Sequence, residues 1–155
     1  MSALVSKKLN KFQNLKKGIE YSLNELEFIE SMWPFRSEDW DKSLTGTGRQ
    51  RGSQQKRDNL KASIGRKLRE IQYPHCIYCG IHENLVGNLQ RDHIAPRNPW
   101  IEFVFEAQNL VLACASCNGF LKKNNFDTIS SYSTEYKKCK FNIIHPYFDK
   151  YQDHI

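Results

Sequence analysis

Four of the five cysteines fall into two Cys-x-x-Cys pairs, Cys76–Cys79 and Cys114–Cys117. A two-residue gap lets both thiolates of a pair face one point, and two pairs complete the tetrahedron that zinc prefers, with Zn–S distances of about 2.3 Å. Two disulfides are the alternative, but they are disfavoured in a reducing compartment. A redox role would account for one pair and leave the other unused. The sequence therefore predicts a structural Zn²⁺ held by these four thiolates, with Cys139 as a spare thiol.

The length and composition limit the fold and the location. A chain of 155 residues has room for one modest domain with an appendage. With 39% hydrophobic and 26% charged residues it can bury a core, so it is neither disordered throughout nor collagen-like. Its apolar runs are far shorter than the roughly 20 residues of a membrane helix. The first residues do not resemble a secretory signal, and we expect a cytoplasmic protein.

Charge is distributed in blocks along the first half of the chain. Residues 1–19 carry five lysines and no acid, and residues 20–41 carry seven acids and one base. Residues 42–69 then carry nine bases and one acid. A local excess of this size is typical of a surface that binds a polyanion, because each neutralised phosphate releases a counterion. A solvated, lysine-coated helix is the alternative.

Two helices are predicted in residues 1–72, a charge-blocked helical extension. Ser22-x-x-Glu25 is a capping box, and the first helix has the apolar positions Leu23, Leu26, Ile29 and Trp33, with Pro34 near its end. Residues 41–54 hold three glycines and predict a loop or linker. The second helix, basic and amphipathic, is expected from about Lys56 to Gln72, with Leu60, Ile64, Leu68 and Ile71 at helical spacing. Core packing is expected for Trp33, Phe35 and Trp40, and a protein-partner patch is the alternative.

The 34 residues between the cysteine pairs are longer than the usual zinc-ribbon loop and must contain further structure. Residues 85–90 are a short strand candidate, which leads into Arg91-Asp92-His93-Ile94-Ala95-Pro96-Arg97. An aromatic stretch follows at 100–105, and residues 109–113 form a second strand candidate. Asn118 is expected to open a helix. The predicted order is strand, loop, strand, helix.

These residues resemble a known family. Asp92-His93-Ile94-x-Pro96, then Asn109-Leu110, then Cys114-x-x-Cys117-Asn118 is similar to the HNH endonuclease motif, in the version whose ββα-metal hairpin is clamped by a four-cysteine zinc. The resemblance covers residues 74–125. It implies an α+β fold with a zinc-stapled ββα-metal core in an HNH nuclease domain, which spans 73–155 and includes a C-terminal tail. Asn118 stands where the family name implies histidine, and the loop after His93 is aromatic instead of glycine-rich.

The chemistry of the motif follows partly from its residues. Hydrolysis of a phosphodiester needs a base that deprotonates water and a cation beside the phosphate. His93 can be that base, because an ordinary histidine is largely neutral at pH 7. The resemblance implies that Asp92 and Asn118 hold a catalytic Mg²⁺ or Mn²⁺ through hard oxygen atoms. It also implies that Asn109 bonds the loop backbone and holds His93 in place.

DNA is the expected substrate, and the expected function is endonucleolytic cleavage. The predicted nucleic-acid contacts are basic side chains: Lys56, Arg57, Lys61, Lys67, Arg69, Arg97, Lys122 and Lys123. The alternatives are a non-catalytic, zinc-stabilised module that binds DNA or RNA, and a subunit of an ATPase-containing complex. The sequence leaves open whether duplex, single strand or RNA is cut, whether any base is recognised, and the oligomeric state.

The segment His145-Pro146-Tyr147-Phe148-Asp149 near the C-terminus resembles an ending found in some small HNH proteins of bacterial anti-phage defence, including the HNH partner of the Septu ATPase. This resemblance implies a role in defence, with a partner ATPase docking on the acidic, aromatic residues 20–41. A packed terminal turn with a buried tyrosine is the alternative, and it is favoured over a catalytic role for His145.

Overall fold

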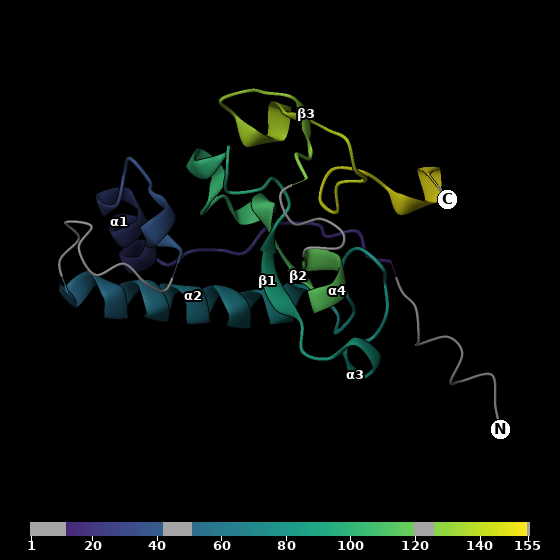
Figure 1. The fold of residues 1–155 in the computed structure, drawn as a ribbon, viewed down its shortest axis with the longest axis horizontal. Helices are drawn as coiled ribbons and strands as arrows, with labels where there is room; N and C mark the ends of the chain where they lie inside the picture. The colour runs from purple at the N-terminus through teal and green to yellow at the C-terminus, as the bar shows by residue number, and fades with distance from the viewer. Residues whose placement is uncertain (1–11, 42–50, 120–125, 155) are drawn as a thin grey trace.

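The computed structural model describes residues 12–41, 51–119 and 126–154. The helices are α1 (Leu23–Ser31), α2 (Arg51–Ile71), α3 (Glu83–Val86) and α4 (Ala115–Asn118). The strands are β1 (Gln90–His93), β2 (Leu110–Ala113), β3 (Ile129–Ser131) and β4 (Lys140–Phe141). Short 3-10 turns lie at η2 (Ser37–Asp39), η3 (Ile101–Phe103), η4 (Ala107–Asn109), η5 (Tyr136–Lys138) and η6 (Tyr151–Asp153). Figure 1 shows α2 as a long rod along one side of the molecule, with α1 near its start and the β1–β2 pair near its end.

The basic helix predicted at 56–72 is α2. Its apolar positions repeat every three to four residues, so Leu60, Ile64 and Leu68 lie on one face and are buried. This face packs against β2, all four residues of which are buried. Burying this stripe holds the helix against the β1–β2 pair.

β1 and β2 form an antiparallel pair in which Asp92 lies opposite Val111 and His93 opposite Leu110. The β2 strand confirms the prediction at 109–113 and leads directly into α4. The order β1, β2, α4 therefore places two strands and a short helix side by side (Figure 1). A second antiparallel pair, β3 with β4, lies on the other side of the molecule from α2.

The capping box predicted at the start of the first helix is formed. The Glu25 backbone N–H donates to the Ser22 hydroxyl, and the Ser22 N–H donates to the Glu25 carboxylate at 2.7 Å. The core face is only partly as expected, because Leu23 is 79% exposed and Trp33 is 61% exposed. The short helix instead packs through Ile29 and the Met32 that follows it.

Three predictions of secondary structure are wrong. The strand predicted at 85–90 begins only at Gln90, the first residue of β1, because the His82 side chain accepts a hydrogen bond from the Asn84 N–H at 3.1 Å and so caps α3. Residues 51–54, expected in the linker, are the first residues of α2. The expected helix at Asn118 begins earlier, at Ala115, since the N–H groups of Cys117 and Asn118 both donate to the Cys114 carbonyl.

One hydrophobic cluster includes residues from both sides of the predicted domain boundary at 72/73, among them Ile29 and Leu60 on one side and Ile94 and Leu110 on the other. A smaller cluster contains Phe103 and Tyr136 and lies beside β3. Among the described helices, none combines the length and apolar character needed to cross a membrane.

Candidate active site and metal centre

A polar cleft of about 290 Å³ lies at the end of β1, and it brings together the predicted base and the two predicted ligands of the catalytic metal. Asp92 and His93 come from β1, and Asn118 is the last residue of α4. Ser37, Trp40, Asp41, Arg91, Pro96, Arg97 and Asn98 complete the lining. Consecutive residues of a regular strand point to opposite faces, but β1 ends at His93, so Asp92 and His93 can line the same cleft.

The His93 ring is fixed on two sides. Its Nε2 lies 2.9 Å from the backbone carbonyl oxygen of Val104, and the Trp40 ring meets it edge-on with centroids 4.4 Å apart. Because a carbonyl oxygen only accepts, Nε2 carries the hydrogen in this contact and Nδ1 carries the lone pair of the neutral ring. His93 is only 5% exposed. The arrangement selects Nδ1 as the basic atom.

Asn109 is fully buried and uses both ends of its amide. Its Nδ2 donates to the carbonyls of Ala95 and Phe103, at 3.2 and 2.9 Å, and its Oδ1 accepts from the Ala95 N–H at 2.6 Å. The Ile94 N–H donates to the Asn109 backbone carbonyl at 2.8 Å. Asn109 therefore closes the loop that follows His93, and Phe103 is the neighbour of the Val104 whose carbonyl contacts His93.

The two predicted metal ligands each have a neighbour that limits their orientation. The Tyr78 hydroxyl donates to Asp92 Oδ2 at 2.6 Å, and burial, followed by the charge of Asp92, raises the pKa of Tyr78 well above its ordinary value. The Asn118 amide nitrogen donates to Gln90 at 3.4 Å, so its carbonyl oxygen is the atom suited to a metal. Tyr78 lies within the first cysteine pair.

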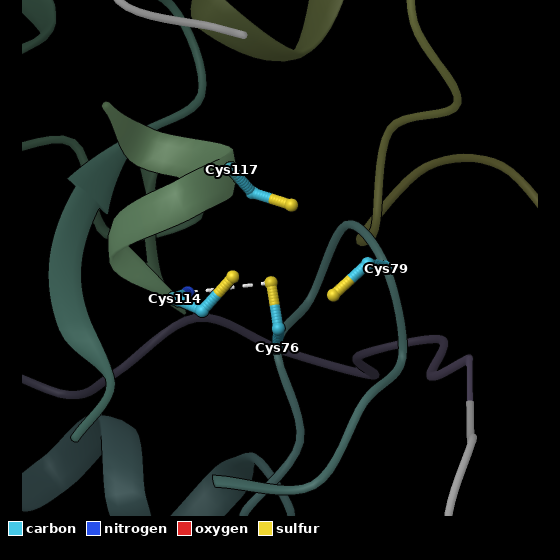
Figure 2. A group of neighbouring side chains, drawn as sticks. All are labelled: Cys76, Cys79, Cys114 and Cys117. Atoms are coloured by element: carbon cyan, nitrogen blue, oxygen red, sulfur yellow. Dashed lines mark hydrogen bonds between the residues drawn. The ribbon is translucent and has the colours of Figure 1, made fainter. Parts of the chain in front are cut away.

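The four cysteines of the two pairs form one cluster. Figure 2 shows their sulfur atoms gathered between the Cys76–Cys79 loop and α4. All four sulfur atoms lie within 4.8 Å of one another, and a tetrahedral zinc site with Zn–S of about 2.3 Å needs S–S separations of roughly 3.8 Å. Burial raises the pKa of the Cys76 thiol, whereas hydrogen bonds from the Cys117 backbone and the neighbouring cysteines outweigh burial and lower the pKa of Cys114. This donor set fits zinc, and no disulfide joins these cysteines.

The basic residues predicted to bind nucleic acid differ in their exposure and in their binding partners within the protein. Arg57 and Lys61 are buried, and the Lys61 ammonium donates to the Trp40 carbonyl at 2.8 Å. Three others are in ion pairs: Lys67 with Glu25 at 2.5 Å, Arg69 with Glu83 at 2.9 Å and Arg97 with Asp41 at 2.7 Å. Lys56 is exposed, with its ammonium 6.0 Å from the centre of the Phe28 ring. Lys122 and Lys123 lie outside the described residues. Arg97 alone among the described ones lines the cleft.

Residues 76–125 match the HNH endonuclease family. This HNH segment is about a third of the chain, and it contains both cysteine pairs together with Asp92, His93, Asn109 and Asn118. No curated protein and no solved structure shows significant similarity to the chain. The family match and the four-cysteine cluster together fit an HNH fold with nuclease activity in general, of the kind that uses divalent metals.

Several residues around the site were not found from the sequence. Tyr78 lies inside the HNH segment, whereas Trp40 comes from the N-terminal extension and Tyr136 from η5. The Tyr136 hydroxyl donates to Asn109 Oδ1 at 2.8 Å, and its oxygen lies 3.1 Å from Nε2 of the buried His145. Tyr78 and Tyr136 act through their hydroxyls and Trp40 through its ring, on residues distant in the sequence, so motif spacing carries no signal for them. The His145-Pro146 segment thus reaches the site through Tyr136, a contact that the sequence does not predict.

Proposed function

We propose that this protein is a metal-dependent HNH endonuclease that hydrolyses phosphodiester bonds in DNA, with His93 as the general base. The observation that carries the proposal is the meeting of Asp92, His93 and Asn118 in one polar cleft. A base and two oxygen ligands around a shared space are the groups that phosphodiester hydrolysis requires.

The orientation of His93 supports its role as a base. With Nε2–H committed to the Val104 carbonyl, Nδ1 accepts the proton of an attacking water as the water oxygen bonds to phosphorus. The bond from phosphorus to the leaving oxygen then breaks, and water protonates that oxygen. Both nitrogens of the imidazolium that forms carry hydrogen, and the Val104 carbonyl stabilises this ion by accepting its Nε2–H. Trp40 and Asn109 act as positioning residues for His93. Trp40 contacts its ring, and Asn109 closes the loop that follows it.

Asp92 and Asn118 would hold the catalytic Mg²⁺ or Mn²⁺ through a carboxylate and an amide oxygen, the hard ligands that these ions prefer. When bound, such an ion would neutralise the negative charge that develops on the phosphate. Zn²⁺ is expected in the separate four-cysteine site, where all positions are filled by sulfur and none is open for chemistry.

Cleavage of supercoiled plasmid by the purified protein tests the proposal. Nicking that requires Mg²⁺ or Mn²⁺, and that stops after mild chelation which spares the thiolate zinc, is the expected result. His93→Ala should abolish nicking while zinc content, melting temperature and DNA binding remain close to those of the parent. Full activity of His93→Ala would exclude this base, and DNA binding by the parent without any cleavage would favour a non-catalytic binding module.

The resemblance of the tail supports a further hypothesis, a role in anti-phage defence together with a partner ATPase. Leu23 and Trp33 in the acidic region 20–41 are exposed, as a docking surface requires. Affinity purification of the tagged protein from its native host tests this: an ATPase that is retained by the parent and lost with Leu23→Asp and Trp33→Asp would support it.

A further inference from the structure

Gly65 lies in the middle of α2, where glycine is unfavourable because it gives the unfolded chain extra freedom. A Cβ atom at this position would lie 3.1 Å from Arg91 Nη1 and 3.8 Å from Arg91 Cδ. The side chain of Arg91 therefore lies across the helix at the glycine. A larger residue at position 65 would take part of the space that Arg91 occupies.

Arg91 is also held at its far end. Its Nη1 donates to the Lys61 backbone carbonyl at 3.0 Å, one helical turn before Gly65. The residue itself lies in β1, immediately before Asp92, and pairs with Leu112 of β2. The position of Arg91 in β1, its contact with α2 and this hydrogen bond together fix its guanidinium. Four of the five guanidinium N–H groups remain for other partners.

The charge of Arg91 is uncompensated, unlike that of its basic neighbours. Arg97, Arg69 and Lys61 each form an ion pair with a carboxylate. Within the part of the chain that the structure describes, no carboxylate pairs with Arg91. A fixed positive charge beside a polar cleft attracts an anion, and a guanidinium suits the oxygen atoms of phosphate.

Arg91 lies where two depressions of the surface meet. It lines the cleft that contains Asp92 and His93, and it also lines a groove of about 600 Å³ along α2. Trp40 is the other residue common to both. The groove is further lined by Arg66, Arg69 and Gln90. Arg69 is paired with Glu83, so the exposed Arg66 is the residue that continues the positive charge away from the cleft. A polynucleotide strand that enters the cleft can continue past Arg91 into this groove.

We propose that Arg91 binds a backbone phosphate of the nucleic-acid substrate next to the one that is cleaved, and that the groove beside Arg66 holds the adjoining nucleotides. This inference rests on the proposed function, since it assigns a substrate path to the same cleft. It also gives α2 a defined role: the helix holds Arg91 through Gly65 and the Lys61 carbonyl, and presents Arg66 beside it.

Binding to a DNA oligonucleotide at several salt concentrations, with His93→Ala as the background so that nothing is cut, tests the site. Arg91→Ala should weaken binding about tenfold, as expected for the loss of a charged hydrogen bond. It should also flatten the log–log salt dependence by about 0.9, the value for one phosphate contact on a duplex. Lys150→Ala is the matched control, because it removes the same charge from a residue that lines neither depression, and it should leave affinity nearly unchanged.

Gly65→Leu tests whether the position of the Arg91 side chain matters, because it displaces that side chain without changing any charge. Leucine favours the helix and changes no charge, but its side chain would fill the place of Arg91. Binding should therefore weaken, with no loss of melting temperature. If Gly65→Leu does not fold, Arg91→Gln provides the second variant, since it keeps hydrogen-bond donors and removes the charge.

The outcomes distinguish this inference from the proposed function. Affinity and salt slope of Arg91→Ala equal to those of the His93→Ala parent would overturn the phosphate site, even where the wild type cuts plasmid. The expected loss of binding in a protein whose wild type never cuts DNA would support the phosphate site and reject the nuclease proposal.

Discussion

At the scale of single residues, the chemistry of His93 depends on a backbone atom. The motif identified the histidine, but the choice between its two nitrogens follows from the Val104 carbonyl, which lies 2.9 Å from Nε2. That carbonyl is positioned by η3, where the Val104 N–H donates to Ile101. Side-chain motifs contain no information on such a contact, so the sequence could propose His93 as a base but could not say which of its nitrogens would accept the proton.

Tyr78→Phe should raise the metal requirement of cleavage without abolishing it. The variant removes the hydroxyl that donates to Asp92 Oδ2 at 2.6 Å and leaves the carboxylate less firmly oriented. Loss of such an outer partner typically weakens metal binding about tenfold or more. Half-maximal nicking should therefore need about tenfold more Mg²⁺, with zinc content unchanged. The measurement is nicking rate against Mg²⁺ concentration.

Tyr132→Phe is the control for Tyr78→Phe, since Tyr132 is exposed and lines neither the cleft nor the cysteine cluster. An identical Mg²⁺ dependence for Tyr78→Phe and the wild type would show that the hydroxyl does not orient a metal ligand.

At the scale of elements, α2 shows that some charges of a local block are paired with acids far away in the sequence. The excess of basic residues in 42–69 suggested a surface for polyanions, but Lys67 pairs with Glu25 of α1 and Arg69 pairs with Glu83 of α3. Their partners lie 42 and 14 positions away, so a local count of charge leaves them out. The acidic block at 20–41 and the basic block at 42–69 thus serve partly to attach α1 to α2, through Glu25 and Lys67.

Lys67→Met should lower the free energy of unfolding by roughly 0.5–1 kcal/mol, the range of a partly exposed ion pair. Burial alone would raise the pKa of Glu25, but bonds from Lys67, Ser63 and the Ser22 backbone lower it to about 2. The pair therefore contributes above pH 4.5, and the contribution is lost as pH falls toward 2. Urea unfolding at pH 7 measures the difference, with the exposed Lys56→Met as the control. Equal stability of Lys67→Met and the wild type would contradict the ion pair.

The cysteine pairs are the elements that the sequence predicted best, because the spacing of metal ligands is itself a geometric constraint. We expect Cys117→Ser to lose zinc and cooperative melting, since metal binding is much of the folding free energy of a small knuckle. Elemental analysis combined with thermal melting checks this. Wild-type protein that is folded, soluble and free of zinc would reject the metal assignment.

The elements that the sequence mispredicted have local causes. The strand expected at 85–90 is mostly absent, because a hydrogen bond to His82 starts α3 at Glu83. The run is too short for its hydrophobic periodicity to distinguish a strand from a helix. The helix expected from Asn118 began at Ala115, because the cysteine pair itself provides the first turn. Strand β2, the capping box of α1 and the apolar stripe of α2 were predicted, since each depends on residues that are close together in the sequence.

At the scale of the whole molecule, the C-terminal tail joins segments that are distant in the sequence. The Tyr147 hydroxyl donates to the Leu110 carbonyl at 2.8 Å, and the Tyr151 hydroxyl donates to the Ile77 carbonyl at 3.0 Å. The Leu15 N–H donates to the Pro146 carbonyl at 2.8 Å. The tail thus contacts the start of β2, the first cysteine pair and the N-terminal segment.

His145 links this tail to the loop behind His93 through a directed chain of hydrogen bonds. Its Nδ1 accepts from the Tyr147 N–H at 3.3 Å, so Nε2 carries the hydrogen and donates to the Tyr136 oxygen. Tyr136 in turn donates to Asn109 Oδ1. Each group gives one hydrogen to the next, and the chain requires a neutral His145. Burial lowers the pKa of His145 to about 4, although the charge of Asp149 opposes this shift.

Neutral His145 makes the stability of the whole fold depend on pH. The unfolded chain binds a proton at this histidine below a pH of about 6.5, whereas the folded chain does so only near 4, so stability falls as pH drops through this interval. Between pH 7 and 5 the loss should be about 2 kcal/mol. His145→Gln retains a donor for Tyr136 and cannot titrate. Over the same pH range its free energy of unfolding should therefore fall by about 2 kcal/mol less than that of the wild type. Urea unfolding of both proteins at pH 7, 6 and 5 measures the difference, and since the cysteines are unchanged, any loss of zinc at low pH affects both equally. Parallel pH profiles would mean that the pKa of His145 is the same in the folded and the unfolded chain, so that Nδ1 is protonated in the folded protein near pH 6.5 and cannot accept the bond from the Tyr147 N–H.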